Sequence, residues 1–395
     1  MLYSCPPLNY GPFSNRIIYL RTMLGAIEMV QNGITGIQDD VSQNPAPTLD
    51  GYNSVFKAYK DIGLRANVAL NVNNKKYTTI LPFTEELIPV EIREKLDQEA
   101  NSSEELIDLY EQIIDKWNNK DKLKVTLSSS APQRCTDKHL QRLWDLSEKY
   151  DLPLHTHVLE TKVQRVSGTE FYGKTIIEHL NDLGLLNKRL SINHSVWVDY
   201  NDMKLMADNN VTVIHNPISN LKLGSGIMPF IDMYNKGINI TLGTDGTSSN
   251  DSLNMFEVMK MTGLLHKTTT PDYNKWPDSH TILNTTTINA AQSLGRKRSI
   301  GTLETGKKAD LIILDLNNSN FIPLNDIENQ LVYCEDGRSV ETVIINGNII
   351  MEDNNLININ KEDIYEEIKE VFSDFKEKYK ITKEKNDEVF PYINK

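Results

Sequence analysis

Cysteine, basic charge and long apolar runs are all scarce in this sequence, and each scarcity excludes a class of protein. The 395 residues contain three cysteines, which are widely spaced and form no CxxC pair. This usage is typical of a reducing compartment, so we expect a cytoplasmic protein without a disulfide framework or a cysteine-rich zinc knuckle. No apolar run approaches the ~18 residues of a membrane span, and no basic-then-apolar signal opens the chain, so no membrane partner is expected.

Basic residues are outnumbered, since 42 lysines and arginines face 54 aspartates and glutamates and the net charge is −12. Binding to a phosphate backbone needs clustered positive charge, so no nucleic-acid partner is expected. No glycine-rich phosphate loop follows any expected strand, which weighs against a sugar- or nucleotide-binding barrel. The expected partner is a small-molecule substrate, and the sequence leaves open whether the chain forms a homo-oligomer.

Histidine is absent from the first 138 residues and gathers in the middle of the chain. His155 and His157 alternate in the stretch Leu154–Thr161, which follows a proline-containing loop and has the character of a short strand. On a strand, both imidazoles point to the same face. Glu160 lies just past the expected strand end, where loops carry chemistry.

Seven segments with strand character alternate with amphipathic helical segments along the chain. The strands are expected near residues 34, 65, 124, 153, 190, 212 and 240, and the first of them is expected to span 34–39. This alternation predicts an α/β fold with parallel strands and right-handed crossovers. A (β/α)8 barrel would need one strand more.

The pattern changes after residue 281. Strand-like runs over 309–315 and 340–350 predict a small β layer, and the Asn346-Gly347 dipeptide inside the second run predicts a hairpin turn. A final amphipathic helix is expected from Ile364 to Phe375, and the charged tail after Lys380 is expected to fray.

Imidazole and carboxylate groups follow three of the expected strands. His157 and His194 end the strands near 153 and 190, and Asp245 follows the strand over 240–243. If these strand ends converge, the three side chains form a hydrolytic metal site. Imidazole and carboxylate ligands suit zinc or iron. A bound divalent metal lowers the pKa of water from about 15.7 toward ~7, which makes hydroxide available at neutral pH.

Taken together and in order, five motifs resemble the amidohydrolase superfamily. The nearest branch contains the methylthioadenosine/S-adenosylhomocysteine deaminases, guanine deaminases and triazine chlorohydrolases. The motifs are His157-Val158-Leu159-Glu160-Thr161, His194, the run from His215 to Gly226, Leu242-Gly243-Thr244-Asp245-Gly246, and the run from Ile300 to Leu311. The resemblance extends from about residue 15 to residue 355.

The resemblance implies a TIM-type (β/α)8 barrel with one divalent metal, most simply zinc, at the carboxyl ends of its strands. His157 and Asp245 would be metal ligands, and Asp245 would also take a proton from the bound water. Glu160 would carry a proton to the leaving or ring nitrogen, and His194 would polarise the substrate or assist the water. Leu127 and Ser128 stand where a two-metal site would need a bridging lysine, so one metal is expected.

The sequence departs from the family at its beginning. The family carries a His-x-His pair of metal ligands at the end of strand one, upstream of the segment that matches residues 15–32, and this chain has no histidine there. We therefore expect a chain that starts late, with a barrel over residues 1–299 that lacks strand one, a partial β-sandwich over 300–358, and a helix and tail over 359–395. With two remaining ligands, zinc affinity should be poor.

A second departure concerns substrate contacts. In adenosine-type deaminases the loop at Ser130 carries a histidine that contacts substrate, so nucleoside specificity is in question here. The candidate substrate-binding residues are Ser130, Gln133, Arg134, Trp197 and His215. Structural roles compete with these assignments: Trp197 would serve equally in the core, and His215 would serve equally to hold its loop. His155 is expected to pack or hydrogen-bond, and Cys135 to be a buried loop residue.

The sequence thus predicts a metal-dependent hydrolase of non-peptide C–N bonds, which deaminates a heteroaromatic or amidine-like small molecule. Two alternatives remain open at this point. One is a hydrolase of the same fold that removes another leaving group, such as halide. The other is a metal-free, inactive remnant of such an enzyme, which elemental analysis of the purified chain would distinguish.

Overall fold

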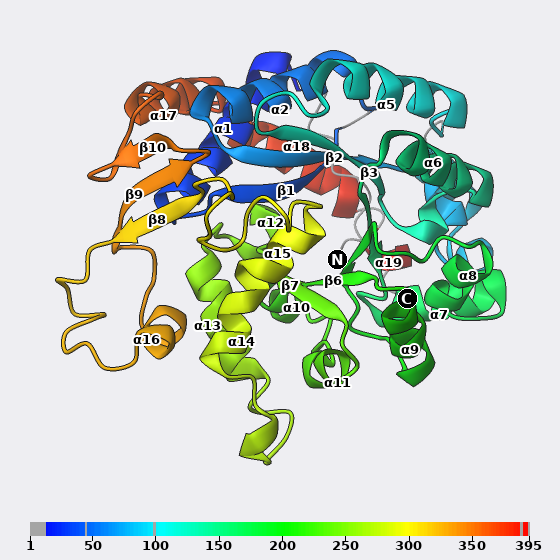
Figure 1. Ribbon diagram of the computed structural model, residues 1–395. Helices are drawn as coiled ribbons and strands as arrows, with labels where there is room; N and C mark the ends of the chain where they lie inside the picture. The colour runs from blue at the N-terminus through cyan, green and yellow to red at the C-terminus, as the bar shows by residue number, and fades with distance from the viewer. Residues whose placement is uncertain (1–12, 44–45, 98–99, 388–389, 394–395) are drawn as a thin grey trace.

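A seven-stranded parallel sheet forms the centre of the computed structural model, which describes residues 13–43, 46–97, 100–387 and 390–393 (Figure 1). Its strands are β1 (Gly36–Val41), β2 (Arg65–Val72), β3 (Leu123–Ser129), β4 (Leu154–Val158), β5 (Leu190–His194), β6 (Thr212–His215) and β7 (Asn239–Leu242). They pair in chain order, and every pair is parallel. The predicted α/β architecture and its seven strands are confirmed.

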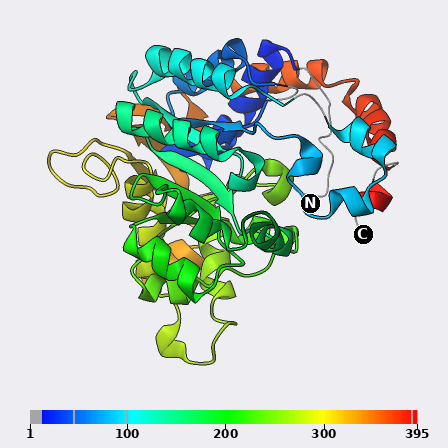
Figure 2. The same ribbon diagram turned by 90° about the vertical axis from the view of Figure 1, so that its right-hand side faces the viewer.

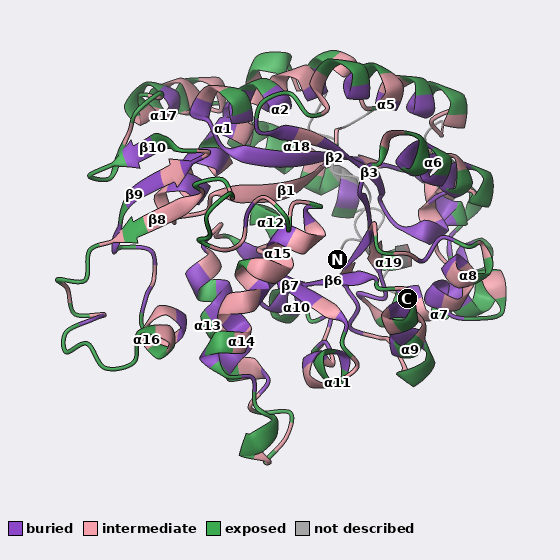
Figure 3. Cartoon of the chain, viewed as in Figure 1, coloured by how far each residue is buried: buried purple, intermediate pink, exposed green. Residues whose placement is uncertain are grey.

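Helices cover the outer face of the curled sheet, and most of the strand residues are buried beneath them (Figure 3). The helices up to β7 are α1 (Asn15–Gln31), α2 (Leu49–Ile62), α3 (Thr84–Leu87), α4 (Val90–Leu96), α5 (Ser103–Trp117), α6 (Asp137–Tyr150), α7 (Lys162–Tyr172), α8 (Ile176–Asp182), α9 (Tyr200–Asp208), α10 (Pro217–Lys222) and α11 (Phe230–Asn235). Those after it are α12 (Thr247–Asn250), α13 (Met255–Leu265), α14 (Ser279–Thr286), α15 (Ile288–Ser293) and α16 (Ile327–Tyr333). No described helix combines the length and apolar character needed to cross a bilayer.

The two edges of the large sheet differ. The β7 edge is covered by α14 and α15, because Asn289 Nδ2 donates to the Ile240 carbonyl at 2.9 Å and Thr241 Oγ1 donates to the Thr285 carbonyl at 2.8 Å. In the described part of the chain, β1 pairs with β2 alone. The sheet is therefore a curled, open barrel of seven strands.

A small second sheet contains β8 (Leu311–Leu314), β9 (Val340–Ile345), β10 (Asn348–Glu352) and β11 (Asn355–Leu356), all antiparallel. The predicted hairpin lies between β9 and β10, where Asn346 and Gly347 have φ of 56° and 79°. Two consecutive positive φ values are the signature of a type I′ turn.

A buried ion pair fastens the small sheet to the barrel. Arg65, at the start of β2, donates from Nε and Nη2 to the two carboxylate oxygens of Asp310 at 2.6 and 2.8 Å. The side chains of Arg65 and Asp310 are only 1% and 4% exposed. Asp310 also accepts from the backbone of Asn346 at 2.7 Å, so one carboxylate holds both the barrel and the hairpin turn.

The C-terminal segment is more helical than the sequence predicted. It forms α17 (Lys361–Val371), α18 (Phe375–Asp387) and α19 (Phe390–Ile393), so the expectation of a frayed chain directly after Lys380 was wrong. Apolar packing explains the order at its end, because Tyr392 packs against a small cluster formed by Ile88 and Leu96. Figure 2 shows these last helices beside the α3–α4 segment.

Candidate active site

Polar side chains from β4, β5 and β7 meet at the carboxyl end of the large sheet. The imidazole rings of His157 and His194 lie 5.5 Å apart between centroids and are tilted by 30°. Asp245 follows β7 and is close enough for both imidazoles to favour its ionised form. The structure thus brings together the three strand-end residues that the sequence singled out.

The backbone is strained where these residues lie. Leu159, His194, Ser195 and Asp245 have φ of 55°, 72°, 49° and 61°. This left-handed region is uncommon for residues other than glycine, and each such residue costs of order 1–3 kcal/mol. Strain of this kind collects at functional sites, and here it occurs at the carboxyl ends of β4 and β5 and in the loop after β7.

His157 is held in one tautomer by the loop after β3. Its Nδ1 lies 2.7 Å from the Ser130 carbonyl oxygen, which can only accept, so Nδ1 carries the hydrogen. Nε2 then carries the lone pair, and among the described residues the hydrogen bond of the His157 ring is made by Nδ1. An imidazole whose other nitrogen donates to a carbonyl is the usual arrangement of a metal-binding histidine.

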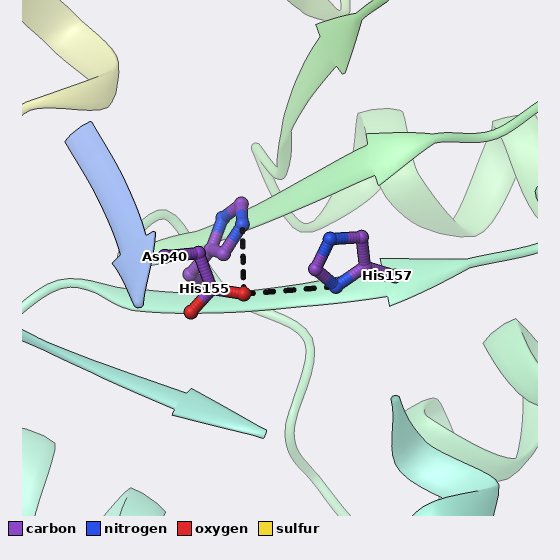
Figure 4. A group of neighbouring side chains, drawn as sticks. All are labelled: Asp40, His155 and His157. Atoms are coloured by element: carbon purple, nitrogen blue, oxygen red, sulfur yellow. Dashed lines mark ion pairs between the residues drawn. The ribbon is translucent and has the colours of Figure 1, made fainter. Parts of the chain in front are cut away.

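Asp40, at the end of β1, is a site residue that the sequence interpretation missed. Its Oδ2 lies 3.8 Å from His157 Nδ1 and 4.0 Å from His155 Nε2, and Figure 4 marks these two contacts with dashed lines. Potential ligand atoms of these three residues all lie within 4.8 Å of one another. Burial raises the pKa of Asp40, although His157 acts against this shift.

The imidazole nitrogens around Asp40 are nevertheless engaged by the protein. His155 Nδ1 lies 2.8 Å from Gln38 Nε2, and His155 Nε2 lies 3.0 Å from Asn193 Nδ2. The nitrogen of His157 nearer to Asp40 is the one bonded to the Ser130 carbonyl. We therefore interpret Asp40 and His155 as polar support that orients His157, and His157 Nε2 as the nitrogen available to a ligand.

Glu160 and His194 form the buried end of the site. His194 is fully buried, and its Nε2 lies 4.0 Å from Glu160 Oε2 without a hydrogen-bond partner among the described residues. Glu160 is 2% exposed, and its backbone N–H donates to Gln164 Oε1 at 2.8 Å. A 4.0 Å gap is too long for a direct hydrogen bond. A small molecule with two hydrogens could instead bridge the two groups.

The groups around Asp245 favour its ionised form. Burial alone would raise its pKa, but the pKa lies below its ordinary value because His194, Ser219 and the Gly246 backbone all favour the carboxylate. Ser219 Oγ donates to Oδ2 at 2.5 Å, and the Gly246 N–H donates to Oδ1 at 2.7 Å.

The other sequence candidates take supporting positions. Arg134 Nη1 donates to Ser130 Oγ at 3.1 Å, and Gln133 is fully buried with its Oε1 3.4 Å from Gln164 Nε2. Trp197 Nε1 donates to the Ser225 carbonyl at 2.8 Å. These contacts build the loops around Glu160 and His157.

His215 and Cys135 are inaccessible. His215 is 0% exposed, its Nε2 lies 3.0 Å from His266 Nε2, and Phe230 stacks on His266. These contacts favour the structural role of holding the turn after β6, and the predicted contact with substrate stays a prediction. Burial raises the pKa of the Cys135 thiol to about 12, which suits an inert residue. Cys334 is exposed and unpaired, and Cys5 lies outside the described residues.

The donor set fits a divalent metal. His157 presents a free imidazole lone pair, Asp245 presents a stabilised carboxylate, and the neighbouring His194 Nε2 is buried without a partner. An imidazole, a carboxylate and open positions are the composition of a catalytic zinc site, although such sites usually draw three ligands from the protein.

A family profile described as the amidohydrolase family matches residues 9–350. The chain belongs to the amidohydrolase family. It is 33% identical over 353 residues to a 5-methylthioadenosine/S-adenosylhomocysteine deaminase of Caldanaerobacter subterraneus, covering 89% of this chain and 74% of that protein. It is 31% identical over 350 residues to a 5'-deoxyadenosine deaminase of Methanosarcina mazei, with the same coverage of 89% and 74%.

Solved structures agree with this assignment. A zinc-bound adenosine deaminase from Xanthomonas campestris superposes with a TM-score of 0.81 at 26% identity, covering 92% of this chain and 76% of that one. A zinc-bound atrazine chlorohydrolase from Arthrobacter aurescens gives a TM-score of 0.80 at 22% identity, covering 90% and 76%, and shares the fold. This amidohydrolase is therefore a metal-dependent hydrolase of non-peptide C–N bonds, as the sequence predicted.

Proposed function

We propose that this amidohydrolase deaminates an aminated heteroaromatic ring, and that the adenine ring of 5'-modified adenosines is the first substrate class to test. Its relatives are named as deaminases of methylthioadenosine, S-adenosylhomocysteine and 5'-deoxyadenosine. The reaction adds the oxygen of water to the ring carbon and breaks its bond to the amino group. The products are the ring carbonyl compound and ammonia.

One observation carries the proposal. His194 Nε2 and Glu160 Oε2 lie 4.0 Å apart, both are buried, and they adjoin the site of His157 and Asp245. Two acceptors at this spacing suit a group that brings two hydrogens, which describes both water and an aromatic amine. Water fits this gap in either reaction, so it is the relatives named as deaminases that favour C–N over carbon–halogen cleavage.

The residues divide the proton transfers between them. His157 and Asp245 would hold the divalent metal, with zinc the expected ion, and the bound metal would supply water that is acidic near neutral pH. The Asp245 carboxylate accepts a proton from the attacking water. Asp245 returns that proton to the departing amine, Glu160 carries the second proton of the water to a ring nitrogen, and His194 Nε2 accepts a hydrogen bond from the incoming water. The groups that take part in these transfers are all largely buried and lie at the carboxyl end of the large sheet.

The test is product release by the purified full chain with added zinc. The panel contains 5'-deoxyadenosine, methylthioadenosine, S-adenosylhomocysteine, guanine and a chlorotriazine, and both ammonia and chloride are quantified. Ammonia from at least one aminated ring, lost in Glu160→Gln, is the expected result. Chloride release alone, or no product from zinc-loaded protein, would overturn the proposal.

A further inference from the structure

Asn220 contacts the nitrogen of His194 that faces away from Glu160. Its Oδ1 lies 2.8 Å from His194 Nδ1, and both residues are almost fully buried. An amide oxygen can only accept a hydrogen bond, so this contact places the hydrogen of the neutral imidazole on Nδ1. Nε2 is then the nitrogen with the lone pair, and it is the nitrogen aimed toward Glu160.

The competing tautomer is disfavoured by the distances. It would set the lone pair of Nδ1 against the Asn220 oxygen at 2.8 Å. Its Nε2–H would have only Glu160 Oε2 at 4.0 Å, beyond hydrogen-bond reach. Asn216 Nδ2 could donate to an unprotonated Nδ1, but it lies 3.5 Å away, at the limit of a hydrogen bond. The shorter contact with Asn220 therefore decides the tautomer.

The backbone of Asn220 is fixed from both sides. Its N–H donates to the Asn216 carbonyl at 3.0 Å, and its own carbonyl accepts from the Ser225 N–H at 2.8 Å. Asn220 lies in α10, directly after Ser219, whose hydroxyl donates to Asp245. One short helix thus presents adjacent side chains to the two groups that flank the reacting centre.

We propose that Asn220 is a positioning residue that holds His194 as its Nδ1–H tautomer, so that Nε2 accepts a hydrogen from the incoming water or the substrate amine. The role in turnover rests on the proposed deamination, whereas the tautomer itself does not. An amide suits this task because it orients the neutral ring without adding a negative charge beside it.

The tautomer is measurable without activity. Nitrogen and carbon chemical shifts of isotope-labelled histidine in the full chain distinguish Nδ1–H from Nε2–H, and loss of one signal in His194→Gln assigns it. The wild-type protein and Asn220→Asp should both show the Nδ1–H form, because a carboxylate can also only accept. A wild-type Nε2–H form would overturn the proposal, since the amide would then be reversed.

Kinetics test the role of the tautomer in turnover. Asn220→Leu removes the acceptor at similar volume and should lower kcat about 10–100-fold with a smaller change in KM, by analogy with the loss of activity when a hydrogen-bond partner of a metal-binding histidine is removed. Asn220→Asp should recover part of that loss. If Asn220→Leu changes the tautomer but keeps wild-type kcat, the positioning role is wrong. If none of the substrates tested for the proposed function is turned over, that function is wrong. The histidine chemical shifts still decide the tautomer in that case.

Discussion

Ser219 Oγ lies 2.5 Å from Asp245 Oδ2, and this hydrogen bond joins α10 to the loop after β7. The hydroxyl favours the ionised carboxylate and fixes the direction of its oxygens. Ser219→Ala should therefore weaken zinc binding about 10–100-fold, as losses of groups that orient metal ligands do. Competition with a zinc chelator measures the affinity.

Ser249→Ala is the matched control for that prediction. Ser249 is a buried serine of α12, shortly after Asp245, but its hydroxyl donates to the Gly246 carbonyl at 3.0 Å, and no hydrogen bond joins it to Asp245 among the described residues. The zinc affinity of the Ser249→Ala variant should equal that of the wild type. Equal affinities in both variants would show that the Ser219 hydroxyl does nothing for Asp245.

The Arg65–Asp310 pair predicts how the small sheet is held. Asp310→Asn leaves a buried guanidinium without its counter-charge, and breaking such a pair costs about 3–5 kcal/mol of the free energy of unfolding. Denaturant unfolding measures this loss. Arg16→Ala is the control, because its pair with Glu367 is solvent-exposed and should contribute only about 0–1 kcal/mol. Similar losses in the two variants would contradict the structural role assigned to Asp310.

His139 predicts a dependence of stability on pH. Burial lowers its pKa from 6.5 to about 4, so the unfolded chain binds a proton more readily than the folded chain between these values. The contribution of neutral, buried His139 to the free energy of unfolding is complete above pH 6.5 and is lost as the pH falls toward 4. With about 1.4 kcal/mol per pKa unit, the loss from this residue approaches ~3 kcal/mol.

His139→Gln tests that contribution. The variant keeps a polar side chain near Ser103, whose hydroxyl lies 2.9 Å from His139 Nδ1. Its free energy of unfolding should fall less than that of the wild type between pH 7.5 and pH 4.5. An unchanged pH dependence in His139→Gln would mean that His139 has the same pKa in the folded and the unfolded chain.

The fold and three strand-end residues were predictable because local signals carry them. Apolar runs mark each strand, and His157, His194 and Asp245 each lie where a strand stops. Asp40 was missed because the first strand was expected to end at Asp39, whereas β1 continues for two more residues to Val41. Side chains alternate between the two faces of a strand. Asp39 therefore points outside the barrel, where it accepts a hydrogen bond from the Tyr59 hydroxyl at 2.6 Å, and Asp40 faces His157.

The supporting residues had no local signal. Ser219 and Asn220 contact partners 26 residues away, and Gln38 reaches His155 across 117 residues. Such pairs depend on how parallel strands bring their ends together, which sequence spacing does not record. His215 also contacts a residue far away in the sequence, His266. For this reason the sequence left open whether His215 lines the pocket or holds its loop.

Zinc binding by three proteins tests the central assignment most directly: the wild-type chain, Asp245→Ala and Asp40→Asn. We propose His157 Nε2, which carries the lone pair, and the Asp245 carboxylate as the metal ligands, with Asp40 as support. Titration with zinc should show one site in the wild type, no measurable binding in Asp245→Ala, and retained binding in Asp40→Asn. Full binding in Asp245→Ala together with its loss in Asp40→Asn would contradict the account, because the metal would then lie between Asp40 and the histidines of β4.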